Sequence, residues 1–357
     1  MIEIAPTPEA QDPIRAANAS SAAPPRELQL RTARAVIAKT LGPQQLAQLH
    51  EQNLAMDLAA IFGSIALFCL LAWQLATASA SSLIWWLCLG LQGNLIVVMG
   101  IINHDVFVHR KRLPTPWRWI VSSILAWPAQ LRASVYESQH LAHHRGLGTD
   151  NDTEMHKHGL DSAMRRLLYA TPALLVFRML FYRGVHARPP ARPVHGGDPR
   201  LRFETNTRRV LIACALLSLA FDWRLLVVGY LLPLLVVSPL INTLRIVLEH
   251  FDLDAGNPFW VGTFYRTGFI TRPMFWWGAG DCHIVHHFYA NIPFYRMPAA
   301  LRLLRPILQA QGVYEHRSLA PLLADWFRAR RGHWSVPRQA QEQALGQSRR
   351  QAGAAAP

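Results

Sequence analysis

Apolar residues are concentrated in four long stretches of this chain that carry almost no charge. The first two cover residues 57–79 and 83–103, and the other two cover residues 205–221 and 225–241. A helix of about 20 uncharged residues crosses the ~30 Å hydrocarbon core of a bilayer. Only three residues separate the members of each pair. The pattern therefore predicts four transmembrane helices in two hairpins.

The remaining segments predict a membrane domain with a tail at each end. Residues 26–50 have helical periodicity with a basic side and end near Gly42 and Pro43, which predicts an amphipathic helix. Such a helix lies either on the membrane surface or against the protein. Residues 1–27 and 331–357 have the composition of disordered tails around a domain at 28–330, and residues 1–27 contain no signal-peptide core. We expect an uncleaved, cytosolic start.

Composition supports a membrane protein and narrows the classes of partner. Hydrophobic residues make up 51% of the 357 residues, and the formal net charge is +14. Such a charge suits nucleic acid, anionic lipid or an acidic protein, but the long apolar stretches favour lipid and argue against nucleic acid. The four cysteines form no disulfide framework and no Cys-x-x-Cys metal motif.

Eight histidines fall into three tight groups, and two of these share the spacing H-x-x-H-H. On a helix this spacing presents three imidazoles on one face. Neutral imidazole is the commonest protein ligand for transition metals, and eight ligands exceed the four positions of one tetrahedral zinc. The pattern therefore favours two metal ions. The groups are His104 and His109; His140, His143 and His144; and His283, His286 and His287.

The first group has a different geometry, because residues i and i+5 lie about 140° apart on an ideal α-helix. Either the helix ends there, or His104 and His109 approach different metals.

His250 is a ninth candidate ligand, since it follows the fourth apolar stretch much as His104 follows the second. Carboxylates often orient ligating imidazoles through the other ring nitrogen. Among the nearby acids, which include Asp105, Glu137 and Asp152, we expect Glu249 and Asp281 to do so.

The topology follows from the positions of the histidine groups and the charges. Two weaker apolar stretches, 117–131 and 167–182, each contain proline and arginine. If only one of them crossed the bilayer, the histidine groups would lie on opposite sides, so we place both in the interface. Of the 36 Lys and Arg residues, all but Arg224 then lie on the histidine side. The positive-inside rule assigns that side to the cytosol, and we expect the cell inner membrane.

Taken together, these motifs resemble the membrane fatty acid desaturase superfamily over roughly residues 55–310. The shared features are the three histidine boxes, Arg245-x3-Glu249-His250 before the last box, and the run Thr149-Asp150-Asn151-Asp152 after the second. The resemblance implies an all-α integral membrane fold with four spans, interfacial helices and a cytosolic helical cap holding the metal site. In the stearoyl-CoA desaturase branch an asparagine stands four residues before the ligand that matches His250. This chain has Ile246 there.

The resemblance also implies a chemistry. A non-haem di-iron centre would use O₂ to introduce a double bond into a fatty acyl chain, with the nine histidines as iron ligands. The chain has no iron–sulfur, nucleotide or haem-binding signature, so the electrons would come from a separate ferredoxin, rubredoxin or cytochrome b5-like donor. Relatives with the same boxes hydroxylate or ketolate lipids and carotenoids, and this remains an alternative.

Two other functions are disfavoured by the sequence. A membrane metal transporter or sensor would need ligands within the spans, whereas all nine candidates cluster at one face. A zinc hydrolase needs three or four ligands rather than nine. The acyl chain length, the head group and the position of attack are not encoded in any motif.

Overall fold

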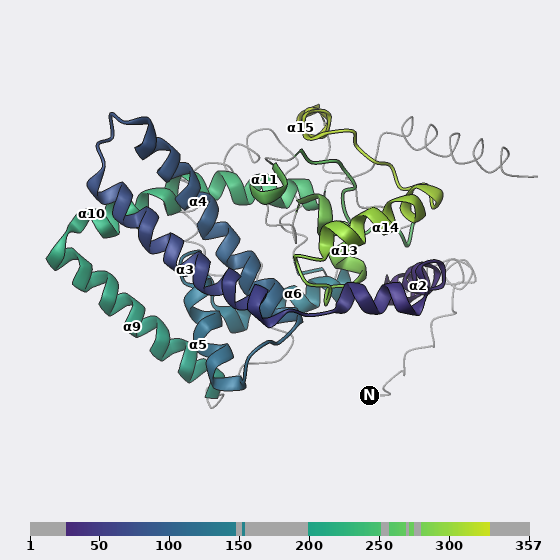
Figure 1. Ribbon diagram of the computed structural model, residues 1–357, viewed down its shortest axis with the longest axis horizontal. Helices are drawn as coiled ribbons and strands as arrows, with labels where there is room; N and C mark the ends of the chain where they lie inside the picture. Colours follow the sequence, from purple (N-terminus) through teal and green to yellow (C-terminus); the bar gives the residue numbers. More distant parts are fainter. Residues whose placement is uncertain are drawn as a thin grey trace, which may run out of the picture.

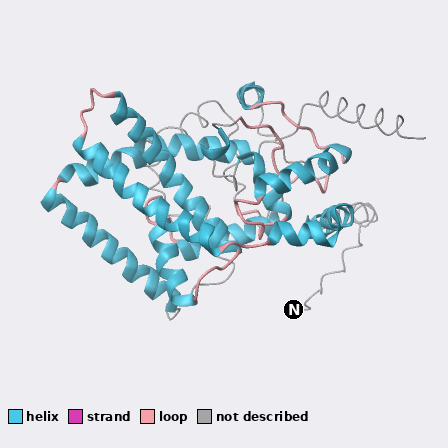
Figure 2. Cartoon of the chain, viewed as in Figure 1, coloured by secondary structure: helices cyan, strands magenta, loops and turns pink. Residues whose placement is uncertain are grey.

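The computed structural model describes residues 26–147, 152–153, 199–250, 257–268, 271–274 and 280–328. Regular structure in these ranges is helical throughout, apart from one isolated bridge between Tyr265 and His316 (Figures 1 and 2). The predicted all-helical fold is confirmed for this part of the chain. The stretch 167–182 and the tails, except residues 26 and 27, lie outside it.

Three helical runs are long and apolar enough to cross a membrane. They cover Leu54–Thr77, Leu83–His109 and Trp223–Asn242. The first is α3 (Leu54–Thr77), and the second joins α4 (Leu83–Asn103) to the π-helix η1 (His104–His109). Large apolar side chains on these runs, such as Phe62, Trp86 and Leu91, are more than half exposed. Lipid is the environment that such side chains require, so these helices indicate a membrane protein.

The third run is continuous but irregular. It passes through α10 (Trp223–Leu226), two π-helical turns, η3 (Val227–Leu231) and η4 (Pro233–Val237), and α11 (Ser238–His250). These turns place the run close to its neighbours. A Cβ on Gly93 of α4 would clash with the side chain of Val237, and the Gln92 amide donates to the carbonyls of Phe68 and Gly229. Small residues and interhelical hydrogen bonds of this kind hold helices together in membranes.

The predicted span at 205–221 lies in α9 (Pro199–Phe221), which is not among the three candidate spans. Its first half carries Arg208 and Arg209, and its uncharged part, 210–221, is about 18 Å long at 1.5 Å per residue. That length is shorter than the hydrocarbon core. Nevertheless, α9 packs against α10 (Figure 1), and many of its apolar side chains, such as those of Val210 and Leu217, are exposed.

A second group of helices forms a cap at the other end of the molecule (Figure 1). It contains α2 (Arg26–His50), α13 (His283–Phe288) and α14 (Met297–Ala310), which share one apolar core. The kink in α2 is at Gly42, whose φ of 77° suits glycine. Because Leu30 and Ile37 of α2 are buried in that core, this helix packs against the protein, which was one of its two predicted environments.

Two further helices pack against those already described. α5 (Thr115–Ala126) packs against α4 and α9, and α6 (Ala133–Gly146) contacts α2, α5 and α9. Three further elements are α12 (Thr271–Met274), the 3₁₀ turn η5 (Gly280–Cys282) and α15 (Leu319–Arg328). η5 leads directly into α13; η5 contacts α11, and α13 packs against α14.

Candidate metal centre

The first histidine box lies in a π-helix rather than an α-helix. In η1 the backbone repeat is i to i+5, so His104 and His109 lie on the same side of the helix. Their Nε2 atoms are 3.2 Å apart. The structure therefore selects neither predicted alternative, because the helix continues through the box and both imidazoles reach one site.

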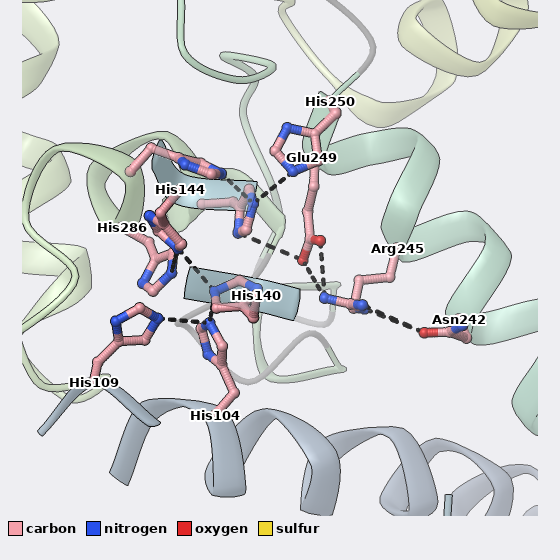
Figure 3. A network of polar contacts seen from close by, with 11 residues as sticks. His104, His109, His140, His144, Asn242, Arg245, Glu249, His250 and His286 are labelled. Atoms are coloured by element: carbon pink, nitrogen blue, oxygen red, sulfur yellow. Dashed lines mark hydrogen bonds and ion pairs between the residues drawn. The ribbon is translucent and has the colours of Figure 1, made fainter. Parts of the chain in front are cut away.

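Five histidines gather around one point, and we call them the five-histidine group. The Nε2 of His140 lies 2.7 Å from that of His104 and 2.8 Å from that of His144. His144 is in turn 3.0 Å from the Nε2 of His286 (Figure 3). Two nitrogens bound at right angles to one metal, each at about 2.1 Å, lie about 3 Å apart. The group consists of His104, His109, His140, His144 and His286.

The other four candidate ligands form a second, adjacent cluster, the four-histidine group. The Nε2 of His283 is 3.1 Å from that of His250 and 2.9 Å from that of His287. The ligand atoms of His143, His250 and His287 lie within 4.8 Å of one another. All nine histidines named from the sequence thus fall into two groups, each with the spacing expected around one metal ion.

Helix geometry divides each H-x-x-H-H box between the two groups. In α6, positions i and i+4 (His140 and His144) belong to the five-histidine group, whereas His143 at i+3 belongs to the other. In α13 the division is reversed, since only His286 at i+3 joins the five-histidine group. Positions i+3 and i+4 point about 100° apart. Each box therefore serves both sites.

The chemistry of these side chains suits metal binding. Burial lowers the pKa of His144, His286 and His287 well below the ordinary value, and the neighbouring histidines lower it further. These imidazoles are therefore neutral, and neutral imidazole is the form that coordinates a metal. The Nε2 of His143 is buried with no hydrogen-bond partner among the described residues. A metal ion would satisfy this lone pair, so the residues fit such a group.

Asp152 orients one of these histidines. Its Oδ1 lies 2.7 Å from the Nδ1 of His143, and both side chains are fully buried. Because a carboxylate accepts hydrogen bonds, Nδ1 carries the proton and Nε2 keeps its lone pair free for a ligand. In the sequence, Asp152 is one of several acids near the histidine boxes, and it was not among the two predicted to orient a ligand.

The two acids singled out from the sequence lie close to the four-histidine group. The Oε1 of Glu249 is 3.7 Å from the Nδ1 of His283, and Glu249 also accepts hydrogen bonds from Arg245. Figure 3 shows this network continuing along α11 to Asn242. Asp281 instead pairs with Arg272 at 2.7 Å and accepts a hydrogen bond from Thr267. Its orienting role remains a prediction.

Charged residues hold in place two of the helices that carry histidine boxes, η1 and α6. Arg110 follows η1 and donates to both carboxylate oxygens of Asp57 in α3, at 2.9 and 2.7 Å, and to Asp105 at 2.7 Å. Glu204 of α9 accepts from the backbone and hydroxyl of Ser134 and so caps the first turn of α6. Neither role was found from the sequence. In both cases the only signal is a charge within or beside an apolar stretch.

One histidine outside the boxes and apart from His250 is also buried. His316, which belongs to no box, is 2% exposed, and its backbone pairs with Phe264 and Arg266. It lies beside Tyr314, and their rings meet edge to face. Neither metal-ligand group contains it.

Comparison with known proteins agrees with this geometry. The sequence profile described as fatty acid desaturase matches residues 80–318, which include all three boxes and His250. The chain belongs to the fatty acid desaturase family. An oleate hydroxylase from Claviceps purpurea is 30% identical over 138 residues, which cover 36% of this chain and 29% of that protein. The alignment thus spans less than a third of that relative.

Replacing Asp152 by asparagine should weaken metal binding without unfolding the protein. An amide can donate to Nδ1 and so favours the wrong tautomer of His143. Carboxylates that orient a ligating histidine typically contribute 10–100-fold to metal affinity, so we expect a loss of about that size. Iron retained after dialysis against a graded chelator measures it.

Glu137→Gln is a matched control, because Glu137 lies in the same α6 helix but pairs with Arg200 instead of a histidine. Equal iron retention in Asp152→Asn and the wild type would remove Asp152 from the site.

Proposed function

We propose that this protein is an O₂-dependent di-iron oxidoreductase that introduces a double bond into a fatty acyl chain of a lipid. The observation that carries the proposal is the division of nine histidines, eight of them from the three boxes, into two adjacent groups with metal-ligand spacing. Family membership supports iron as the metal and a lipid as the substrate.

The nine histidines are the proposed iron ligands. The five-histidine group would hold one ion and the four-histidine group the other, with Glu249 and Asp152 orienting ligands of the second. Bound iron would supply the reduction of O₂ and the oxidising power needed to break an unactivated C–H bond. The chain's own part is to keep nine imidazoles neutral and fixed. Burial of the centre also excludes bulk water from the reaction.

Electrons must come from a separate carrier. Desaturation takes two hydrogens from the acyl chain and two electrons and two protons from outside, and it converts O₂ to two waters. We propose a ferredoxin, rubredoxin or cytochrome b5-like donor that docks on the cytosolic side. The basic character of the chain, +14 overall, favours an acidic donor.

The proposed topology has four spans in two hairpins. α3 packs against α4 and α9 packs against α10, which supports the pairing. The uncharged part of α9 is short, but Arg208 and Arg209 can extend their side chains to the interface, and the bilayer thins around short spans. Both termini and the metal centre then lie in the cytosol, and the inner membrane is the proposed location.

Hydroxylation is the second candidate, and the similarity to an oleate hydroxylase favours it. It needs the same O₂ and two electrons but leaves one oxygen atom in the product. Product mass therefore separates the two reactions, because desaturation removes two hydrogens and hydroxylation adds one oxygen.

The test is lipid profiling of cells that express the protein, together with the metal content of the purified enzyme. Two irons per chain and a new unsaturated acyl species would support desaturation. Two irons and an oxygenated lipid would replace it with hydroxylation. If iron reconstitution and a reductant yield neither product from the lipids of the host membrane, the oxidoreductase proposal fails.

A further inference from the structure

The third histidine box is contacted by a part of the chain that lies outside the matched family region. The profile begins at residue 80, whereas α2 covers Arg26–His50. Even so, α2 packs against α13 and α14, and Leu30, Ala33 and Ile37 share a core with Ile284 and Val285.

One side chain of α2 reaches the backbone of the box itself. The Nε of Arg34 donates to the carbonyl of Phe288 at 2.6 Å, and a terminal nitrogen donates to the carbonyl of His287 at 3.3 Å. In return, the hydroxyl of Tyr289 donates to the carbonyl of Arg34 at 3.1 Å. The two segments are thus joined by reciprocal hydrogen bonds across more than 250 residues of sequence.

The position of these bonds matters because α13 has only six residues. The last four carbonyls of a helix have no partner within it, and a short helix has few internal bonds to keep its shape. His287 and Phe288 are each 1% exposed, so water does not replace a missing donor at their carbonyls. A guanidinium there also complements the negative end of the helix dipole.

We propose that Arg34 is a positioning residue that fixes α13 so that its histidines are held at both metal positions. The inference rests on the proposed metal centre and deepens it, because it assigns part of the site to the amino-terminal helix. Without Arg34 the end of α13 would lose its cap, and the three imidazoles would no longer be held at ligand spacing.

The test compares three substitutions on α2 in the full-length protein. Arg34→Met keeps the apolar stem of the side chain and removes the donors, and Arg34→Lys keeps the charge with a single donor group. Arg31→Met is the control, because Arg31 lies one turn earlier, is exposed and pairs only with nearby Glu27 among the described residues. Each variant is loaded with Co²⁺, whose visible spectrum reports ligand geometry, and metal release to a chelator is timed.

Arg34→Met should release metal about tenfold or more faster than the wild type, with an altered Co²⁺ spectrum and unchanged helical content. Arg34→Lys should fall between the two, and Arg31→Met should match the wild type. If the wild type binds two ions and Arg34→Met has the same spectrum and release rate, or if Arg31→Met is equally impaired, the positioning role is wrong and the metal centre stands. A wild type that binds no metal would overturn the centre and this inference together.

Discussion

Replacing His286 by alanine should reduce product formation by more than about 100-fold, which is the upper end of the loss expected for residues that merely orient a ligand. His286 is the only contribution of α13 to the five-histidine group, and its Nε2 lies 3.0 Å from that of His144. Its loss leaves four ligands at that position. We expect iron content to fall toward one ion per chain, measured by mass spectrometry alongside lipid analysis.

His50→Gln provides the histidine control. This residue lies in α2, bonds to the backbone of Leu46 and belongs to neither group. It should leave iron content and product unchanged. Full activity in His286→Ala, with membrane insertion intact in both variants, would show that the third box does not take part in the reaction.

Asp57→Asn should destabilise the fold by about 3–5 kcal/mol, the usual cost of removing one partner from a buried ion pair. The side chains of Asp57 and Arg110 are 1% and 0% exposed, and Arg112 donates to the same carboxylate at 3.1 Å. Asparagine keeps the shape but leaves Arg110 with Asp105 as its remaining carboxylate partner, and it removes the carboxylate that Arg112 binds. Unfolding in mixed micelles by a denaturing detergent measures the change.

Asp222 offers a matched control for this experiment. Asp222 also stands at the start of a helix and pairs with an arginine, Arg224, but the pair is exposed to solvent. Asp222→Asn should therefore have no measurable effect on unfolding. In addition, Arg110→Met combined with Asp57→Asn should cost less than the sum of the single changes, because the two residues interact directly. Additive effects would rule out the network.

Much of the arrangement could be predicted from the sequence because it depends on local periodicity. The apolar stretch 83–103 coincides with α4, and the spacing of the H-x-x-H-H boxes places three imidazoles within reach of one another on α6 and α13. The ninth histidine was found by its position at the end of an apolar stretch. Each of these inferences requires only the geometry of a single helix.

The features that escaped prediction depend on contacts between distant segments or on an irregular backbone. A π-helix has no sequence signature, so the shared site of His104 and His109 was not predicted. Asp152 contacts His143 although it lies beyond the end of α6, where helix periodicity no longer gives the position of a residue. The contact between Arg34 and α13 joins residues 254 positions apart, and periodicity contains no information about such pairs.

The π-helix at the first box has a consequence for how this motif tolerates a change in length. A π-turn is an α-helix that has accommodated one extra residue. Deleting Val106 or Val108 would turn the spacing H-x4-H into H-x3-H, and an ordinary α-helix would still present both imidazoles on one side. Arg110 would also keep its direction around the helix axis, because it directly follows the second histidine in either case and so stays in register with Asp57. The π-turn thus absorbs the extra residue within the box and leaves unchanged the phase between the metal ligands and the ionic anchor behind them.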